Sequence, residues 1–340
     1  MTRFPLISIR STDRGIEVET PSKLNLFLEV TARRDDGYHE IETLFLALDT
    51  GDAMVVEADS DRRGPDQISV TGFDAPTDAT NLALRAVALA RSTRPIPAVR
   101  VDLVKRIPAG AGLGGGSANA AGMLAILDFW FPDPRGVDGV RLDAARLGSD
   151  VAFFLGDDAA AIGRGRGELL EGLRPGKLFG GDAPAFVIVL PRVHSSTPDA
   201  YREVSLALTS QSGPITFPAT TFETSGEWQR GLFNRLEAPV LTSVPQLAEL
   251  ARHLGITAHP GRASESDPSF AWSRASEPLA VRMTGSGSAF FVAGRDLAHA
   301  RQIDAALRAP GGPLEAFEQH TGVVASTLCA RPHPHFLPRV

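Results

Sequence analysis

The sequence has almost no cysteine, because Cys329 is the only one among 340 residues. A single cysteine cannot form a disulfide within the chain or a metal site built from several cysteines. We therefore expect Cys329 to be a small apolar side chain of the core. The sequence also lacks an apolar run of about 18 residues, the length that a membrane-spanning helix requires.

Positive charge is in short supply as well. The chain carries 34 Lys and Arg against 40 Asp and Glu, a formal net charge of −6, so neither nucleic acid nor a membrane is an expected partner. Residues 1–20 have no hydrophobic signal core and include several acidic residues, which indicates a cytoplasmic protein. The length fits one large or two ordinary domains, and nothing in the sequence sets the oligomeric state.

Glycine is abundant, and it concentrates in residues 108–119, where five of twelve residues are glycine. This stretch follows a predicted strand, 99–103, and leads into a predicted helix, 118–130. Glycine lets the backbone approach a ligand closely, and a helix start offers unpaired N–H groups to an anion. The stretch therefore predicts a phosphate-binding loop.

Three other interpretations of this loop have to be weighed. Gly110, Gly112 and Gly115 satisfy G-x-G-x-x-G, but the second strand ending in an acid that a dinucleotide-binding fold needs does not follow. A P-loop is excluded because Gly116 stands where that motif requires lysine. A glycine-rich turn that binds nothing is the third alternative.

The rest of the chain mixes strands and helices without regular alternation, which favours an α+β fold. Apolar periodicity and helix caps define the elements. The predicted strands are 16–20, 23–30, 40–48, 53–58, 99–103, 185–191 and 289–293, and the predicted helices are 82–91, 118–130, 141–147, 246–254 and 296–308. Polar segments at 208–227 and 258–277 indicate loops, and a composition shift at 163–167 indicates a domain boundary.

Three motifs, in order, resemble those of the galactokinase, homoserine kinase, mevalonate kinase and phosphomevalonate kinase superfamily. Residues 21–27 (Pro-Ser-Lys-Leu-Asn-Leu-Phe) resemble its first motif, and residues 108–119 resemble its phosphate loop. Residues 283–288 (Met-Thr-Gly-Ser-Gly-Ser) resemble its second glycine-rich loop. The resemblance implies an ATP-dependent small-molecule kinase.

Further segments are most similar to one branch of this superfamily, at residues 23–45, 148–154 and 196–201. That branch phosphorylates the 2-hydroxyl of a cytidine-diphospho sugar alcohol in the non-mevalonate isoprenoid pathway. Two features depart from it. Ala152 stands where the branch usually has proline, and the insertion at 258–277, with Phe270 and Trp272, has no counterpart in it.

The resemblance implies an α+β fold of two domains with the active site in the cleft between them. Residues 1–165 would form a ribosomal-protein-S5-like, ATP-binding domain, and residues 166–340 a ferredoxin-like substrate domain. The final strand, 323–328, is a candidate to return to the first domain.

The resemblance also implies a catalytic pair. Asp150 would take the proton from the accepting hydroxyl. Lys23 would be its cationic neighbour, holding the carboxylate ionised and stabilising charge on the attacking oxygen. Without the resemblance, Asp150 would be interpreted as a helix cap and Lys23 as a solvated charge on a strand.

ATP and Mg²⁺ are the implied cofactors. Backbone N–H groups of the loop would bind the ATP phosphates, and two positions outside it align near the adenine. Ser117 would reach phosphate or Mg²⁺, cap the helix, or do both. The implied ATP-binding residues are Asn81, Lys105, Pro108, Ala109, Gly110, Ala111, Gly112, Leu113, Gly114, Gly115, Gly116 and Ser117.

The implied substrate carries a cytidine diphosphate group. Tyr38 and Tyr201 are the only two tyrosines of the chain, and both fall where the branch places aromatic rings around the cytosine. His39 would hydrogen-bond the edge of the base. Contacts to the phosphate or sugar-alcohol end are implied for Asn25, Thr197, Gly285 and Ser286.

Two competing hypotheses stay open. One is a superfamily kinase acting on homoserine or mevalonate, against which the Tyr38-His39 pair and residues 197–201 argue. The other is a nucleotide-binding sensor without catalysis, against which the presence of both Asp150 and Lys23 argues.

Overall fold

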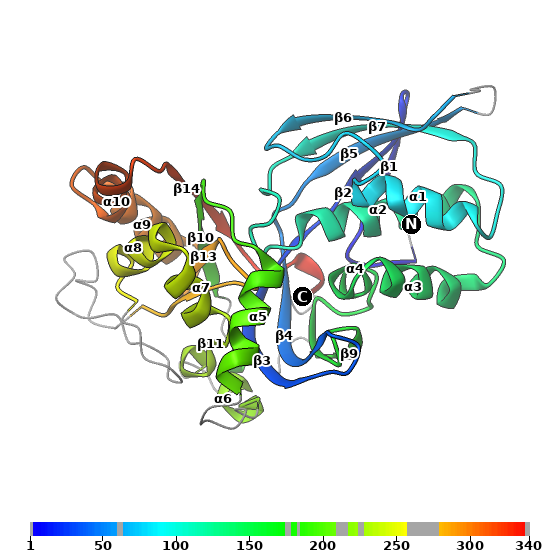
Figure 1. The fold of residues 1–340 in the computed structure, drawn as a ribbon. Helices are drawn as coiled ribbons and strands as arrows, with labels where there is room; N and C mark the ends of the chain where they lie inside the picture. The colour runs from blue at the N-terminus through cyan, green and yellow to red at the C-terminus, as the bar shows by residue number, and fades with distance from the viewer. Residues whose placement is uncertain are drawn as a thin grey trace.

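The computed structural model describes residues 3–59, 64–173, 178–181, 184–208, 217–223, 228–256 and 279–336. They form two bodies that lie side by side, joined by a long strand pair (Figure 1). The insertion at 258–277, with Phe270 and Trp272, lies outside the described residues. Within the described residues, no helix has the length and apolar character that crossing a membrane requires.

The first body is built on a five-stranded sheet in the order β1-β2-β5-β7-β6. Its strands are β1 (Ser8–Thr12), β2 (Gly15–Glu19), β5 (Ala53–Asp59), β7 (Ala98–Lys105) and β6 (Gln67–Gly72). All neighbours pair antiparallel except β6 and β7, which are parallel. Four helices cover one face (Figure 1): α1 (Leu82–Arg91), α2 (Gly115–Trp130), α3 (Gly136–Leu147) and α4 (Ser149–Phe154).

Helix α2 is the centre of this body. Its residues from Ala118 to Asp128 are buried, and it contacts α1, α3, α4 and β2. A helix that is apolar on all sides is stable only when other elements surround it, as they do here. The glycine loop that precedes it is therefore attached to a rigid element of the core.

A second sheet carries the strand pair that joins the bodies. Its order is β11 (Phe233–Asn234), β3 (Ser22–Arg33), β4 (His39–Leu48), β8 (Ala160–Arg164) and β9 (Leu169–Gly172). Strand β3 is buried on both faces over residues 22–30, so Lys23 and Asn25 are as inaccessible as Leu24 and Leu26. The pairing of β3 with β4 shifts register between Asn25 and Phe27.

The second body contains a four-stranded antiparallel sheet covered by helices. Its order is β12 (Val281–Met283), β13 (Phe290–Gly294), β10 (Ala185–Pro191) and β14 (Ala325–Ala330). The helices are α5 (Thr197–Leu208), α6 (Ala219–Glu223), α7 (Glu237–Ser243), α8 (Pro245–His253), α9 (Leu297–Leu307) and α10 (Pro313–Thr321). Short 3₁₀ turns occur at Phe179–Gly181, Trp228–Gly231 and Pro334–Phe336.

Two expectations about domain organisation need correction. The break expected between residues 165 and 166 falls inside the β8–β9 hairpin, whose pairing continues to Gly172. The expected final strand does not return to the first body, because β14 pairs with β10. The chain returns only after β14, where Pro332 bridges to Leu48 and Arg331 bonds Asp49.

Most predicted elements are present with changed ends. Helix α1 has the predicted bounds, and Asn81 caps it by accepting a hydrogen bond from Ala83 N at 3.0 Å. Helix α3 begins five residues before the predicted start at 141, because Gly136 turns the chain into it with φ +72°. Helix α6 forms within the segment predicted as loop at 208–227.

Candidate active site

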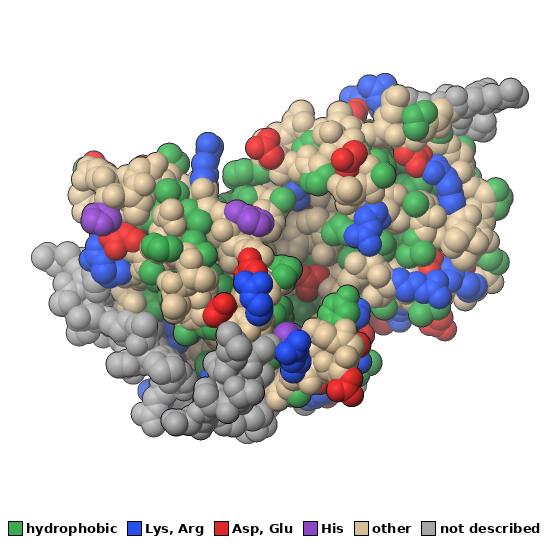
Figure 2. All heavy atoms as spheres, viewed as in Figure 1, with side chains coloured by type: hydrophobic (Ala, Val, Ile, Leu, Met, Phe, Trp, Pro, Cys, Tyr) green, Lys and Arg blue, Asp and Glu red, His purple; other side chains and the backbone are tan. Residues whose placement is uncertain are grey.

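The glycine loop lies at the junction of the two bodies, where the surface is hollowed (Figure 2). It lines a cavity of about 530 Å³ together with Lys23 and Asp150. Gly114 is the residue before α2, with φ +70°, and no side chain caps the helix there. The first N–H groups of α2 therefore have no partner within the helix, and they are available to an anion.

The glycine loop packs directly on the second glycine-rich segment, residues 283–288. A Cβ on Gly112, whose φ is +77°, would lie 2.1 Å from the carbonyl oxygen of Thr284. Ala289 N donates to Ala111 O at 3.1 Å, so the two segments are also hydrogen-bonded. Only glycine at position 112 allows this approach, and it makes the two loops one floor of the cavity.

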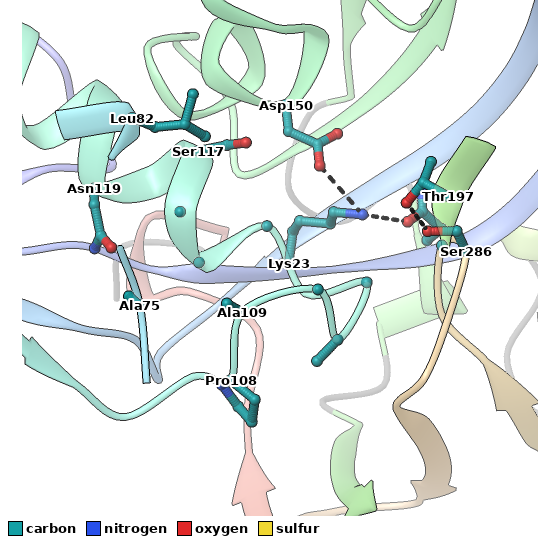
Figure 3. Close-up of a pocket in the computed structure, with 18 of the residues that line it drawn as sticks. Lys23, Ala75, Leu82, Pro108, Ala109, Ser117, Asn119, Asp150, Thr197 and Ser286 are labelled. Atoms are coloured by element: carbon teal, nitrogen blue, oxygen red, sulfur yellow. Dashed lines mark hydrogen bonds and ion pairs between the residues drawn. The ribbon is translucent and has the colours of Figure 1, made fainter. Parts of the chain in front are cut away.

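Lys23 and Asp150 meet in this cavity. Lys23 Nζ lies 3.6 Å from Asp150 Oδ2 and also donates to Asn25 Oδ1 (Figure 3). The lysine side chain is 4% exposed and the aspartate side chain 30% exposed. Burial lowers the pKa of the Lys23 ammonium, and the negative charge of Asp150 partly opposes that effect. A charged donor and a carboxylate thus face one point of the cavity.

Asn25 lines the same cavity, but its polar atoms are engaged with the protein. Its Nδ2 donates to Thr43 Oγ1 at 2.8 Å, and that hydroxyl donates to Phe27 O. Its backbone N–H donates to Thr284 Oγ1 at 3.0 Å. Asn25 therefore orients the Lys23 ammonium and ties β3 to the second loop.

Lys105 and Asn81, both expected near the adenine, also line this cavity. Lys105 is buried and forms an ion pair with the buried Asp52. Asp52 Oδ1 accepts hydrogen bonds from Arg106 N and Ile107 N, at 2.7 and 2.9 Å. This pair holds the chain at the entrance to the glycine loop. Nothing in the sequence near Asp52 marks it as a partner of Lys105.

A second cavity, of about 690 Å³, adjoins the first. Tyr38, His39 and Tyr201 all line it, although Tyr201 is far from the other two in the sequence. The His39 and Tyr201 rings stack with centroids 5.1 Å apart, and the guanidinium of Arg166 lies 4.3 Å from the Tyr38 ring centroid. Ile41, Arg166, Thr197 and Tyr201 line both cavities, so the two spaces share a wall.

Helix α5 supplies one wall of both cavities. Thr197 and Tyr201 are four residues apart and so lie on the same face of that helix. Thr197 Oγ1 lies 2.6 Å from Ser286 Oγ, and Ser195 Oγ donates to Ser286 O at 2.7 Å (Figure 3). Burial and the negative charge of Asp150 raise the pKa of Tyr201, so its phenol stays neutral.

A distant segment holds the second glycine loop in place. Asn234 Nδ2 donates to Met283 O and to Gly285 O, each at 2.8 Å. Glu237 accepts a hydrogen bond from Met283 N at 2.8 Å, and burial raises the pKa of its carboxyl. Residues 234–237 thus satisfy three backbone groups of the loop through side chains.

Comparison with known proteins places this geometry in a family. Residues 81–166 match the family model for the GHMP kinases N terminal domain. The chain is 34% identical over 293 residues to the 4-diphosphocytidyl-2-C-methyl-D-erythritol kinase of Burkholderia thailandensis, covering 85% of this chain and 89% of that one. It is 37% identical over 294 residues to the enzyme of that name from Thermus thermophilus, covering 86% and 92%.

The chain belongs to the 4-diphosphocytidyl-2-C-methyl-D-erythritol kinase family. A crystal structure of 4-(cytidine 5'-diphospho)-2C-methyl-D-erythritol kinase superposes with a TM-score of 0.66 at 31% identity, covering 93% of this chain and 99% of that one. These matches confirm the resemblance and the α+β fold class that the sequence predicts.

Several residues that build this kinase-family site were not predicted from the sequence. Asp52, Arg166, Asn234 and Glu237 lie outside the three motifs, and each acts through a contact with a segment far away in the chain. A signal for Arg166 exists in hindsight, since it lies in the glycine- and arginine-rich stretch 163–167. On composition alone, that stretch indicates only a domain boundary.

Proposed function

We propose that this chain transfers the γ-phosphoryl group of ATP to the 2-hydroxyl of 4-diphosphocytidyl-2-C-methyl-D-erythritol. The observation that carries the proposal is the position of the Lys23–Asp150 pair, 3.6 Å apart, where a glycine loop and an aromatic-lined cavity meet. The relatives of the chain supply the substrate, because their names state it. The isoprenoid pathway of that substrate is the proposed cellular role, and a cytoplasmic location stays a prediction.

In the proposed reaction, Asp150 is the general base. The acceptor hydroxyl would bind between its carboxylate and the Lys23 ammonium. As the hydroxyl oxygen forms its bond to the γ-phosphorus, its proton passes to Asp150 and the bond to the β,γ-bridging oxygen breaks, which releases ADP. Positioning and electrostatics, rather than covalent chemistry, stabilise this loose transition state.

The glycine loop would hold the ATP phosphates. The N–H groups at the start of α2 have no side-chain cap, and Ser117 lines the same cavity as Asp150 (Figure 3). Burial and the charge of Arg33 lower the pKa of His39. Its neutral ring would hydrogen-bond the edge of the cytosine, which would lie between Tyr38 and Tyr201.

Mg²⁺ fits the residues present. The described residues contain no cluster of three acidic, histidine or cysteine side chains able to hold a metal on their own. Mg²⁺ commonly takes only one or two protein oxygens and completes its shell with phosphates and water. Ser117 Oγ is an oxygen in the cavity that would hold it, beside the ATP phosphates. When bound with ATP, the ion neutralises developing charge on the phosphates.

A kinase assay with purified protein tests this function. We expect ADP release and a phosphorylated product, identified by mass, with 4-diphosphocytidyl-2-C-methyl-D-erythritol as acceptor, and at most trace turnover with homoserine or mevalonate. CDP, which lacks the sugar alcohol, should inhibit this turnover and should not itself be phosphorylated. Preferential turnover of homoserine or mevalonate would contradict the proposal, as would ATP binding without turnover of any of the three.

A further inference from the structure

The second cavity is lined by arginines and by no carboxylate. Five arginines from five different segments face it, namely Arg33, Arg85, Arg146, Arg166 and Arg202. Aspartate and glutamate outnumber lysine and arginine in the chain as a whole, 40 against 34. A wall of one sign in a protein of the opposite net charge creates a local positive potential, which attracts an anionic ligand.

Three of these arginines have no ion-pair partner within the described residues. Arg146 and Arg202 pair with Asp143 and Asp199 on their own helices, at 3.5 and 2.8 Å. Arg33, Arg85 and Arg166 have no carboxylate within ion-pair distance in the described part of the chain, and Arg33 and Arg85 are exposed. Among the described residues, none of these three guanidinium groups is held in an ion pair, although that of Arg166 lies over the Tyr38 ring and its charge helps to lower the pKa of Asp36.

Arg166 differs from the other four because it lines both cavities. It is half-buried, and its guanidinium lies over the Tyr38 ring at 4.3 Å. Its carbonyl oxygen accepts a hydrogen bond from Ser149 Oγ at 2.9 Å, and Ser149 directly precedes Asp150. Arg166 is thus anchored at one end to the expected catalytic helix and at the other to the expected base-binding tyrosine.

We infer that Arg166 binds the diphosphate that links the nucleoside to the sugar alcohol of the substrate. The inference rests on the proposed function. If the cytosine lies at Tyr38 and the acceptor hydroxyl at Asp150, the diphosphate has to cross the boundary between the two cavities, where Arg166 lies. A planar guanidinium forms paired, charge-assisted hydrogen bonds with phosphate oxygens, which an ammonium does not reproduce.

Calorimetric binding of CDP and cytidine tests this inference without any turnover. A non-hydrolysable ATP analogue, kept at saturation, prevents either probe from occupying the ATP site. We expect the native protein to bind CDP about tenfold or more tightly than cytidine, because hydrogen bonds to charged groups are the strong ones. Arg166→Gln should remove most of that preference and change cytidine binding little, and Arg166→Lys should retain part of it.

Arg164→Gln is the matched control. Arg164 is two residues away, pairs with Glu42 and Glu171, and lines neither cavity, so this variant should keep the native preference for CDP. An Arg166→Gln protein that still prefers CDP would overturn the inference, as would one that loses CDP and cytidine binding equally. The kinase assay separates the two proposals. If the native enzyme turns over its substrate but Arg166→Gln still prefers CDP to cytidine, only the inference about Arg166 is refuted.

Discussion

At the scale of single residues, the proposed chemistry depends on a buried ammonium beside a partly exposed carboxylate. Lys23 loses water contacts on folding, and it recovers interactions from Asp150 and Asn25. Leu113 O accepts a hydrogen bond from Lys23 N at 3.0 Å, which fixes the strand beside the glycine loop. The pair is therefore oriented before any substrate binds, and little reorganisation is needed at the moment of reaction.

Asp150→Asn keeps the shape of the side chain and removes the base. We expect kcat to fall by about 10² or more, the usual contribution of a general base, while the Kd of an ATP analogue changes little. Lys23→Met should cost a similar factor, and the double variant should lose less than the product of the two, because the residues act as one unit. Steady-state kinetics and calorimetry measure these quantities. Near-native turnover by Asp150→Asn would show that another group takes the proton.

At the scale of elements, the site depends on how two glycine loops are held together. The first is fixed by α2 and by the Lys105–Asp52 pair at its entrance. The second is held by the segment at residues 234–237 through Asn234 and Glu237. Strand β11 also pairs with β3, the strand that carries Lys23. One short segment therefore contacts both the second loop and the strand of Lys23.

Asn234→Asp tests whether the segment at residues 234–237 positions the second glycine loop. The variant keeps the acceptor for Leu236 N but replaces two donors to Met283 O and Gly285 O with an oxygen that repels them. We expect kcat/KM for the acceptor substrate to fall about tenfold or more, since buried carbonyls left without partners cost about 1–3 kcal/mol each. Glu237→Gln is the control, because its amide oxygen still accepts from Met283 N. Unchanged kinetics at a lowered melting temperature would assign Asn234 a purely structural role.

Local signals were sufficient for the strongly periodic elements, but not for β1, β6, α5 or α10, nor for the contacts between elements. The Asn81 cap and the apolar periodicity after it predict α1 with its observed bounds. The glycine spacing predicts a loop at a helix start, and that loop lines a cavity with Lys23 and Asp150. The close approach of Gly112 to Thr284, and the pairing of Lys105 with Asp52, are set by tertiary packing, which no residue pattern along the chain encodes.

At the scale of the whole molecule, the two bodies are held together at more places than the strand pair. After β14 the chain leaves the second body and contacts the end of β4 in the first. Arg331 Nε donates to Asp49 Oδ2 at 2.9 Å, and His333 N donates to Ala47 O at 2.8 Å. This returning segment clamps the two bodies on the side of β4 and adds long-range contacts to the fold.

His333 makes the stability of this clamp depend on pH. Burial lowers the pKa of its imidazole from 6.5 to about 4, an effect that the charge of His335 reinforces and that of Asp49 opposes. The folded protein therefore favours the neutral ring, so the stabilisation is complete above pH 6.5 and is lost as the pH falls towards 4. One pKa unit corresponds to about 1.4 kcal/mol. Acidification from pH 7 to 4.5 should therefore lower the free energy of unfolding of the native protein by on the order of 2 kcal/mol more than that of His333→Asn.

Urea unfolding at both pH values measures that difference, and it cancels the contributions of all other titrating groups. His320→Asn, a change at a histidine whose side chain is 69% exposed, is the control and should follow the native protein. If His333→Asn lost as much stability on acidification as the native protein, the ring would not be buried and neutral in the folded state. The returning segment would then be attached only through Arg331 and the Pro332 bridge, and the clamp would be insensitive to pH in this range.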